Sequence, residues 1–368
     1  MSGGLRVMLV QTQAENAGAQ EIARVLGQAL AAKGHQISNV FFFKKSATFS
    51  EQPNTVYCAG SRPSSLPQLL QMLWNLARTI RRARPDVVLT FQHYGNTIAA
   101  PVARLVAAAP VIANQVSAPR TMNRLVRAFD MALGLAGIFR TITVNSHDLE
   151  RVYARYPKPY RDKLVHVAHG FAERTSHLSS TDARRQFDLP ANAVVLGCVA
   201  RLHPLKALDH AIRILPTQPG WHLALLGQGE DKARLSEIAS ELGVADRVHF
   251  VGEVAPDRIG DFLAALDVFV FPSQAETFGL AAVEAAQARV PVVAHDLPVL
   301  REVLAFEDQP AALFVDTADA NAFSNAVRSV LDNQDLRQSL QQSGSRLKRL
   351  YSVDKMVADY EKILAQVT

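Results

Sequence analysis

Short apolar runs alternate with longer amphipathic stretches through the first half of the chain. Runs of this kind predict buried strands, and apolar residues three or four positions apart predict helices that cover them. A helix predicted over 18–33 ends at the pair Gly34-His35, because glycine often follows a helix. Further helices are predicted near 66–84 and 96–107, and strands over 5–10, 37–43, 87–91, 111–113 and 142–144. This alternation favours a parallel sheet with helices on both faces.

A polar stretch over 172–181 interrupts the alternation and predicts a linker between two domains. A second series follows, with strands predicted over 194–200, 222–226, 247–250, 268–271, 290–294 and 312–315. A chain of 368 residues also exceeds what one core usually organises. We therefore expect two doubly wound α/β domains, with ligands bound in a cleft at the carboxyl ends of their strands.

The last segment predicts a helix. Ser352 is a candidate N-cap, and the apolar residues that follow share one helical face: Met356, Val357, Tyr360, Ile363, Leu364 and Val367.

Charge is distributed unevenly along the chain. Residues 1–180 hold 21 Lys and Arg against 9 Asp and Glu, so 21 − 9 = +12, and the remainder holds 18 against 25, so 18 − 25 = −7. Two arginine clusters lie in helix-like stretches with apolar neighbours: Arg78, Arg81, Arg82 and Arg84, and Arg120, Arg124 and Arg127. This pattern is typical of a helix on an anionic membrane surface, and a solvated basic face is the alternative. No nucleic-acid-binding motif accompanies the charge, so we expect no nucleic acid partner.

No apolar run approaches the length of a membrane span, and the apolar stretch near Met1 is too short for a secretory signal. We expect a cytoplasmic protein, with a peripheral position at the inner face of the membrane as the second option. The two cysteines, Cys58 and Cys198, form no CxxC pattern and no Cys/His cluster. They predict buried packing residues, neither a disulfide nor a metal site.

Two cations follow the strand predicted over 194–200. Arg201 and Lys206 lie five residues apart, where the carboxyl end of that strand faces the expected cleft. A guanidinium binds phosphate oxygens in a bidentate fork, and a lysine acts as a point charge. The pair therefore predicts a clamp for a sugar-nucleotide diphosphate, with two solvated charges as the alternative.

Two carboxylates flank the next candidate element. The strand over 268–271 leads to Glu276 in a loop, then to Gly279 and a helix predicted over 281–288 that contains Glu284. Glycine at the helix start lets backbone N–H groups approach a phosphate, and the helix dipole favours the negative charge. Glu284, further into the helix, is placed to accept hydrogen bonds from ribose hydroxyls.

At these residues the sequence resembles family 4 of the retaining glycosyltransferases, which have the GT-B architecture. The family's basic pair, G-R-L-x-x-x-K-G, corresponds to residues 200–207, and its E-x7-E element runs from Glu276 to Glu284. Other matching segments are 16–20, Gly34-His35, 144–146, 169–171, the G-x-G turn at 226–230, the strand 247–252 and 296–302. The resemblance covers nearly the whole chain.

The sequence departs from the family at a few positions. Alanines replace both glycines around the basic pair, at Ala200 and Ala207, and Arg289 stands where a glycine is usual. Gln115 stands closest to the place of a family histidine that points at the donor sugar, and His93 is a substitute candidate.

The resemblance implies two Rossmann-like parallel-sheet domains that face each other across a cleft. Residues 1–175 would bind the acceptor, residues 176–350 the nucleotide sugar, and the helix over 351–368 would pack back on the first domain. It also implies front-face transfer with retention. Arg201, Lys206 and the amides near Phe278, Gly279 and Leu280 would stabilise the leaving diphosphate, Glu276 would hold the sugar, and Glu284 the ribose.

Four further residues complete the expected site. Gly18 would approach the donor, and His93, Gln115 and Gly252 are weaker candidates. The sequence contains no Asp-x-Asp motif, so we expect no essential metal and no cofactor besides a donor of the UDP or GDP type.

The predicted activity is transfer of a hexose-type sugar to a glycan or lipid-linked acceptor in cell-envelope polysaccharide synthesis, such as that of lipopolysaccharide. A nucleotide-sugar hydrolase or epimerase of the same fold and a non-catalytic sugar-nucleotide-binding protein stay open as alternatives. A dinucleotide oxidoreductase is disfavoured because neither half has G-x-G-x-x-G after its first strand.

Overall fold

The structure is a computed structural model that describes residues 4–15, 17–45, 52–117 and 119–367, with the backbone alone described for Arg120. Two compact units make up the chain. Unit 1 comprises Met1–Phe171 and Tyr351–Thr368, and unit 2 comprises Ala172–Leu350. Asn16, in the loop that the sequence places before Gly18, lies outside the described residues.

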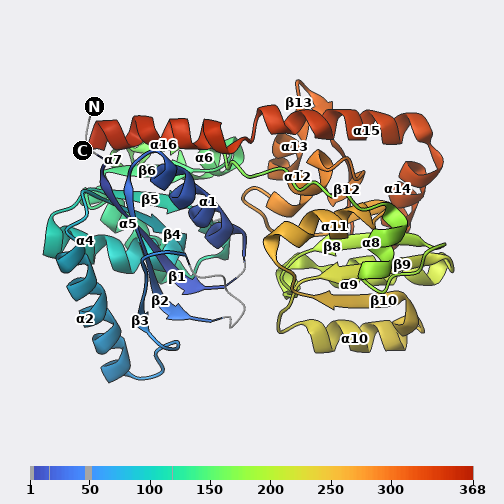
Figure 1. Ribbon diagram of the computed structural model, residues 1–368, viewed down its shortest axis with the longest axis horizontal. Coiled ribbons are helices and arrows are strands. Elements are labelled where there is room, and N and C mark those ends of the chain that lie inside the picture. The colour runs from blue at the N-terminus through green and yellow to red at the C-terminus, as the bar shows by residue number, and fades with distance from the viewer. Residues whose placement is uncertain (1–3, 16, 46–51, 118, 368) are drawn as a thin grey trace. The chain divides into compact units, whose positions relative to one another are not determined.

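The described part of unit 1 folds around a seven-stranded sheet in the order β3-β2-β1-β4-β5-β6-β7 (Figure 1). All neighbouring strands in this sheet are parallel. The strands are β1 (Arg6–Ala14), β2 (Gln36–Lys44), β3 (Thr55–Ala59), β4 (Val87–Phe91), β5 (Val111–Gln115), β6 (Thr141–Val144) and β7 (Leu164–His166). Sequence patterning predicted five of them and missed β3 and β7, whose residues are mostly half-buried.

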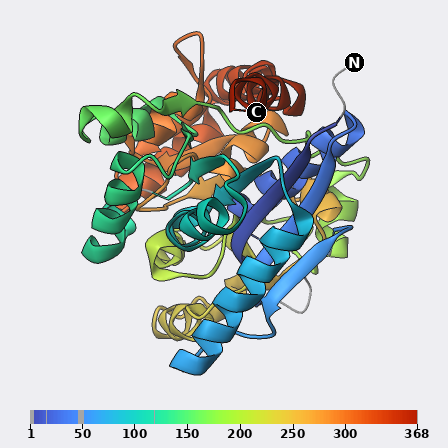
Figure 2. The same ribbon diagram turned by 90° about the vertical axis from the view of Figure 1, so that its left-hand side faces the viewer.

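The helices of unit 1 cover both faces of this sheet. They are α1 (Gly18–Ala32), α2 (Leu66–Ala83), α3 (Gln92–Tyr94), α4 (Ala100–Ala107), α5 (Arg124–Leu135), α6 (His147–Tyr153), α7 (Lys158–Arg161) and α16 (Val353–Val367). A π-helical turn over Gly95–Ala99 and a 3₁₀ turn over Pro119–Thr121 complete the set. Met72, Leu76 and Ile80 form the buried stripe of α2, which packs beside α4 and β3 (Figure 2).

The C-terminal helix α16 belongs to unit 1, where it lies beside α1 (Figure 1). The Ser352 hydroxyl accepts a hydrogen bond from the Lys355 N–H at 3.3 Å, which confirms the predicted N-cap. Tyr360 donates its hydroxyl to Asn114 Oδ1 at 2.5 Å, and this pair is buried. The prediction that the last helix returns to the first domain is therefore confirmed.

Unit 2 contains a six-stranded parallel sheet in the order β10-β9-β8-β11-β12-β15. Its strands are β8 (Val194–Val199), β9 (Trp221–Leu226), β10 (Val248–Gly252), β11 (Val268–Phe271), β12 (Val292–His295) and β15 (Ala312–Val315). The described residues also form a short antiparallel ribbon of β13 (Ala305–Phe306) and β14 (Gln309–Pro310). All six predicted strands of the second series are present, with small shifts at their ends.

The helices of unit 2 are α8 (Ser180–Gln186), α9 (Leu208–Arg213), α10 (Lys232–Glu241), α11 (Ile259–Ala264), α12 (Leu280–Gln287), α13 (Pro298–Val303), α14 (Ala320–Asp332) and α15 (Gln334–Arg346). Short 3₁₀ turns occur at Pro204–Lys206, Leu215–Thr217, Ala245–Arg247, Pro256–Arg258 and Leu347–Arg349. None of the helices in the described ranges is both long and apolar enough to cross a bilayer.

Both sheets reverse their strand order at one point, between β1 and β4 in unit 1 and between β8 and β11 in unit 2. The resulting order is that of a doubly wound Rossmann-like sheet, which confirms the predicted fold class. Ligands of such sheets bind outside the carboxyl ends of the two strands that flank the reversal. The loops after β1, β4, β8 and β11 are therefore the candidate ligand-binding loops.

Candidate functional site

The loop that follows β8 is held in place by glycines of the loop that follows β9. A Cβ atom on Gly227 would lie 2.0 Å from the carbonyl oxygen of Ala200, and one on Gly229 would lie 2.0 Å from that of Leu202. The Leu202 N–H donates to the Gln228 carbonyl at 2.9 Å. The predicted G-x-G turn is therefore a close contact between two backbones, which side chains at these glycines would prevent.

Gly252, one of the weaker candidates, ends β10 with a φ of +84°. Its carbonyl accepts a hydrogen bond from the Gly227 N–H at 2.8 Å. Gly252 thus supports the loops around the site through its backbone.

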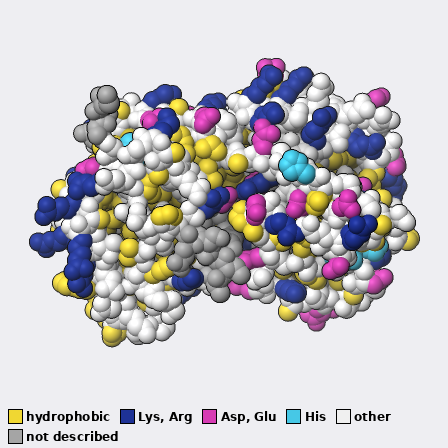
Figure 3. Space-filling model, viewed as in Figure 1, with side chains coloured by type: hydrophobic (Ala, Val, Ile, Leu, Met, Phe, Trp, Pro, Cys, Tyr) yellow, Lys and Arg dark blue, Asp and Glu magenta, His cyan; other side chains and the backbone are white. Residues whose placement is uncertain are grey.

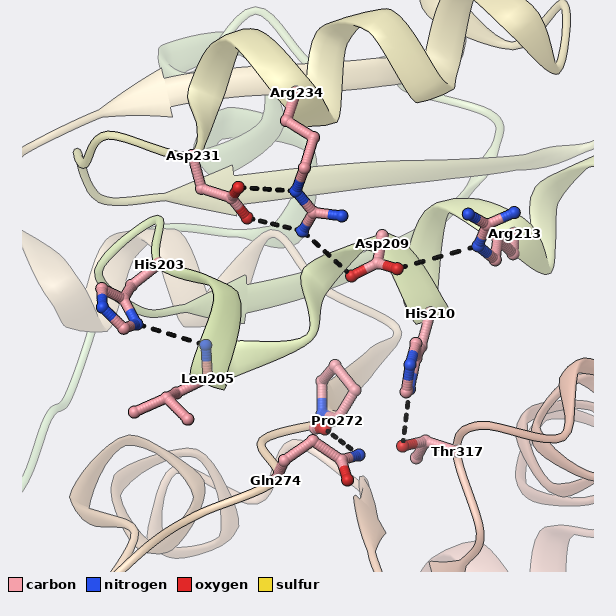
Figure 4. Close-up of polar contacts among 10 residues, drawn as sticks. All are labelled: His203, Leu205, Asp209, His210, Arg213, Asp231, Arg234, Pro272, Gln274 and Thr317. Atoms are coloured by element: carbon pink, nitrogen blue, oxygen red, sulfur yellow. Dashed lines mark hydrogen bonds and ion pairs between the residues drawn. The ribbon is translucent and has the colours of Figure 1, made fainter. Parts of the chain in front are cut away.

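The basic turn itself is capped by a histidine. His203 Nδ1 accepts the Leu205 N–H at 3.2 Å and thereby closes the 3₁₀ turn that contains Lys206 (Figure 4). Burial, together with the positive charges of Arg201 and Lys206, lowers the pKa of His203. The lower pKa keeps the imidazole neutral near pH 7, as an acceptor nitrogen requires.

An ion-pair network lies next to this turn (Figure 4). Arg234 donates to Asp231 at 2.7 Å and to Asp209 at 3.2 Å. The hydrogen bonds that Arg234 donates to Asp231 are the main cause of the raised pKa of Arg234. This network joins the start of α10 to α9, which begins directly after the basic loop, and so fixes the base of the loop.

Lys206 and Glu276 meet although they are 70 residues apart in sequence. Lys206 Nζ lies 2.6 Å from Glu276 Oε1, and the two side chains are 24% and 12% exposed. The Gln274 N–H donates to the Leu205 carbonyl at 3.0 Å, so the loops after β8 and β11 are also joined through their backbones. The structure therefore brings together the predicted phosphate-binding cation and the predicted sugar-binding carboxylate.

Arg201, the second cation of the pair, is exposed. It forms no hydrogen bond or ion pair with the residues that the structure describes. Its charge nevertheless acts on His203 in the same turn, as the lowered pKa of that histidine shows. Arg201 is thus free to contact an external anion near Lys206.

Helix α12 begins at the same edge of the sheet. Gly279 is its N-cap with a φ of +85°, and a Cβ atom there would lie 2.6 Å from Leu300 Cδ2. Leu280 is the first helical residue, and Phe278 before the cap is buried. The first N–H groups of a helix have no partner within it and carry partial positive charge, so this end suits an anion.

Glu284 lies in α12, where it is paired with an arginine that sequence patterning did not single out. Arg174 Nε donates to Glu284 Oε1 at 2.7 Å, and both side chains are 10% exposed. Arg174 lies in the polar stretch that was predicted as a linker. A single arginine in such a stretch gives no periodic signal.

The remaining candidates lie in unit 1 and are described within that unit. Gly18 is the first residue of α1 and is exposed. His93 follows β4 in a strained turn, where Gln92 has a φ of +65° and a π-helical turn comes next. Burial lowers the pKa of His93, and its Nδ1 has no hydrogen-bond partner among the described residues. Both residues lie at the reversal of strand order between β1 and β4.

Gln115 ends β5 and is only 1% exposed. Its amide donates to Asp130 at 2.9 Å and to the Tyr160 hydroxyl at 3.0 Å. The structure places Gln115 in the packed interior of unit 1 and not on the surface that contact with a donor sugar would require, because these buried partners hold it there.

Both cysteines are free and buried. Burial raises the pKa of Cys198 to about 12 and that of Cys58 to about 12. Among the residues described, no group of three or more His, Cys, Asp or Glu side chains is arranged to hold a metal ion.

Comparison with solved structures identifies the class of fold. The crystal structure of Anabaena Alr3699/HepE in complex with UDP and glucose matches 98% of this chain and 99% of its own with a TM-score of 0.86 and 18% identity. WaaG, a glycosyltransferase involved in lipopolysaccharide biosynthesis, matches 98% and 99% with a TM-score of 0.78 and 14% identity. The fold is that of the GT-B glycosyltransferases.

Sequence comparison finds a family match for part of the chain. The family model described as glycosyl transferases group 1 matches residues 179–346. The matched segment lies within unit 2, and this part of the chain is similar to that family.

Two curated relatives match half of the chain or less. The D-inositol 3-phosphate glycosyltransferase of Acidothermus cellulolyticus is 36% identical over 42% of this chain and 37% of its own length. The lipopolysaccharide core biosynthesis glycosyltransferase LpsE of Rhizobium meliloti is 32% identical over 50% of this chain and 53% of its own length. The chain thus spans about half or less of the length of these relatives.

The two alanines that stand in place of family glycines differ in backbone conformation. Ala207 has a φ of +46°, a conformation that costs an alanine about 1–2 kcal/mol, whereas Ala200 does not have a positive φ. We predict that Ala207→Gly raises the free energy of unfolding by about 0.5–1 kcal/mol after the extra chain entropy of glycine is subtracted. Ala200→Gly is the matched control and should lower it or leave it unchanged. Denaturant unfolding measures both, and equal effects of the two substitutions would contradict the assignment.

Proposed function

We propose that the chain is a retaining glycosyltransferase that moves a hexose-type sugar from a UDP or GDP sugar to a hydroxyl of a glycan or lipid-linked acceptor. The contact between Lys206 and Glu276 carries this proposal. In a nucleotide sugar one bond joins the glycosyl carbon to the pyrophosphate. A group that binds the pyrophosphate and a group that binds the sugar must therefore lie next to each other, as Lys206 and Glu276 do.

Charge stabilisation is the main task of the proposed site. As the sugar leaves, negative charge develops on the departing diphosphate, and fixed positive groups at that point lower the barrier. Arg201, Lys206 and the amino end of α12 supply such charge from the carboxyl ends of β8 and β11. They would take the part that a divalent metal plays in other enzymes, so the proposed reaction needs no metal ion and no further cofactor.

Retention of configuration would follow from front-face attack. The acceptor oxygen bonds to the glycosyl carbon on the face from which the diphosphate departs, the bond to the phosphate oxygen breaks, and the acceptor proton passes to the departing diphosphate. No protein nucleophile is required. A retaining glycosidase instead needs two carboxyl groups on either side of the bond, and here Glu276 and Glu284 are each paired with a cation.

Lys206→Ala is expected to lower turnover about 100-fold or more, because a principal charge stabiliser is lost. Lys232→Ala is the matched control, since this lysine is exposed in the same unit, its ammonium lies 5.5 Å from the centre of the Phe250 ring, and its side chain forms no hydrogen bond or ion pair with the described residues. Release of nucleoside diphosphate from UDP and GDP sugars, with and without glycan acceptors, measures the rate.

The same assay separates the other candidate functions. A Lys206→Ala enzyme with unchanged turnover would contradict the proposed site. Donor consumption that needs no acceptor would identify a hydrolase or epimerase, and nucleotide binding without any turnover would identify a binding protein.

We further propose that unit 1 docks on an anionic membrane at the cytoplasmic face, where a lipid-linked acceptor of cell-envelope polysaccharide would be found. Residues 52–129 contain nine arginines, no lysine and one acidic residue, Asp86. Asp86 is already paired with Arg6 at 2.6 Å. Basic side chains gather over part of unit 1 in Figure 3. The segment thus offers positive charge that is almost uncompensated.

Exposed apolar side chains lie beside these arginines. Trp74 is 66% exposed on α2 and lines a recess with Val106 and four arginines, Arg78, Arg81, Arg82 and Arg84. Leu66 and Leu70 on α2 and Leu105 on α4 are also exposed. Apolar side chains that enter the acyl boundary, next to arginines that contact phosphates, are the combination that an anionic bilayer binds.

The triple variant Arg78→Ser, Arg81→Ser, Arg82→Ser is expected to bind phosphatidylglycerol vesicles about 100-fold more weakly, since each basic residue near the surface contributes about 1 kcal/mol. Trp74 fluorescence reports insertion, because the other tryptophan, Trp221, is buried in unit 2. Serine at Arg185, Arg213 and Arg328, which are exposed in unit 2, is the matched control. Equal binding to phosphatidylcholine vesicles would contradict this proposal.

A further inference from the structure

Arg174 reaches from the polar segment after Phe171 to two elements of unit 2. Its Nε donates to Glu284 Oε1 at 2.7 Å, and its Nη1 donates to the Pro256 carbonyl at 3.0 Å. Pro256 begins the 3₁₀ turn after β10, and Glu284 lies in the helix after β11. The guanidinium therefore connects the turn after β10 with the helix after β11, the helix whose start is proposed to bind the donor.

The backbone around Arg174 is anchored as well. A Cβ atom on Gly260 would lie 2.4 Å from the Thr175 carbonyl oxygen, so the segment packs directly on α11 at a position that only glycine allows. The Ser176 hydroxyl donates to Asp261 Oδ1 at 2.7 Å. The segment predicted as a linker is thus fixed on unit 2 here. Its backbone is held next to Arg174, and the guanidinium of Arg174 is held by Glu284 and Pro256.

Glu284 needs a cationic partner to remain an ionised acceptor. The whole residue is 7% exposed, and it lies among buried apolar residues of α12, which include Val283 and Ala285. Burial of a carboxylate favours its neutral form unless a nearby charge or hydrogen bond compensates. The Arg174 guanidinium supplies both, and the hydrogen bond from Nε holds Oε1 of the carboxylate in place.

We propose that Arg174 is a positioning residue for the donor ribose. It holds the Glu284 carboxylate in the ionised state and in the orientation that accepts the 2′- and 3′-hydroxyls of a nucleoside diphosphate. A carboxylate has about four acceptor positions, enough for a guanidinium N–H and two hydroxyls. The inference rests on the proposed function and adds a residue outside the E-x7-E element to the recognition of ribose.

The test measures affinity for nucleotides that differ only in the ribose. Isothermal titration calorimetry compares whichever of UDP and GDP the wild-type chain binds more tightly with its 2′,3′-dideoxy analogue. Arg174→Lys retains the charge and removes the Nε donor. It is expected to weaken binding of the ribonucleotide about 10- to 100-fold, as for loss of hydrogen bonds to a charged group. Binding of the dideoxy analogue should change less than about 2-fold, because that ligand lacks the hydroxyls.

Turnover gives a second readout of the same variant. The KM for the donor sugar should rise in Arg174→Lys by the same factor as the ribonucleotide Kd, with kcat nearly unchanged, because the ribose contact is made equally in the ground state and the transition state.

Arg184→Lys is the matched control. Arg184 is a second buried arginine of unit 2, with its side chain 9% exposed and 2.7 Å from Asp267, and it belongs to no proposed binding element. Its variant should lose stability and keep the wild-type preference for ribose. If Arg174→Lys does not fold, the neutral pair Arg174→Gln, Glu284→Gln replaces it and should lose the same preference.

Equal losses for the ribonucleotide and the dideoxy analogue in the Arg174 variant would show a merely structural role and overturn the inference. An unchanged affinity for both would also overturn it. If the wild-type chain binds neither UDP nor GDP, the proposed function fails first and the inference with it, so the two failures are distinguishable.

Discussion

The reversal of strand order between β8 and β11 is the constraint on which the proposed site depends. At this point the connections leave two adjacent carboxyl ends uncovered, so the loops after both strands face the same space. One loop carries Arg201 and Lys206, and the other carries Glu276 and the start of α12. Their backbones are joined by the hydrogen bond from Gln274 to Leu205, and their side chains by the contact between Lys206 and Glu276. Chemistry that requires a cation beside a carboxylate thus follows from the topology of one sheet.

Unit 2 also pairs charges that are buried or partly buried. Glu276 is paired with Lys206, Glu284 with Arg174 and Asp267 with Arg184. Each pair offsets the cost of removing a charge from water. Arg201 remains exposed. An incoming pyrophosphate could therefore contact Arg201 at once and then compete with Glu276 for Lys206, which would leave Glu276 to bind the sugar hydroxyls. The same charges would thus keep the loops ordered before the donor arrives and hold its two halves afterwards.

Sequence patterning predicted those parts of the fold that form clear apolar runs. The bounds of β4, β11 and β15 agree with the predicted ranges, because each is an apolar run with a clear end. The prediction missed β3, whose residues are mostly half-buried, and β7, which is only three residues long. Sequence patterning did not single out Arg174, because its contacts are with Pro256 and Glu284, which are 82 and 110 residues away in sequence. Gln115 was selected because it stands closest to the place of a family histidine, and the sequence does not show its hydrogen bonds to Asp130 and Tyr160. The positive φ values of Ala207 and Arg289 explain why glycine suits these two positions.

The most direct test of the central claim is a crystal structure of the chain with a bound nucleoside diphosphate sugar. Our account predicts the pyrophosphate within hydrogen-bond distance of Arg201, Lys206 and backbone amides at the start of α12, with the hexose hydroxyls on Glu276. A nucleotide bound away from the carboxyl ends of β8 and β11, with Lys206 and Glu276 still joined to each other and to nothing else, would contradict it.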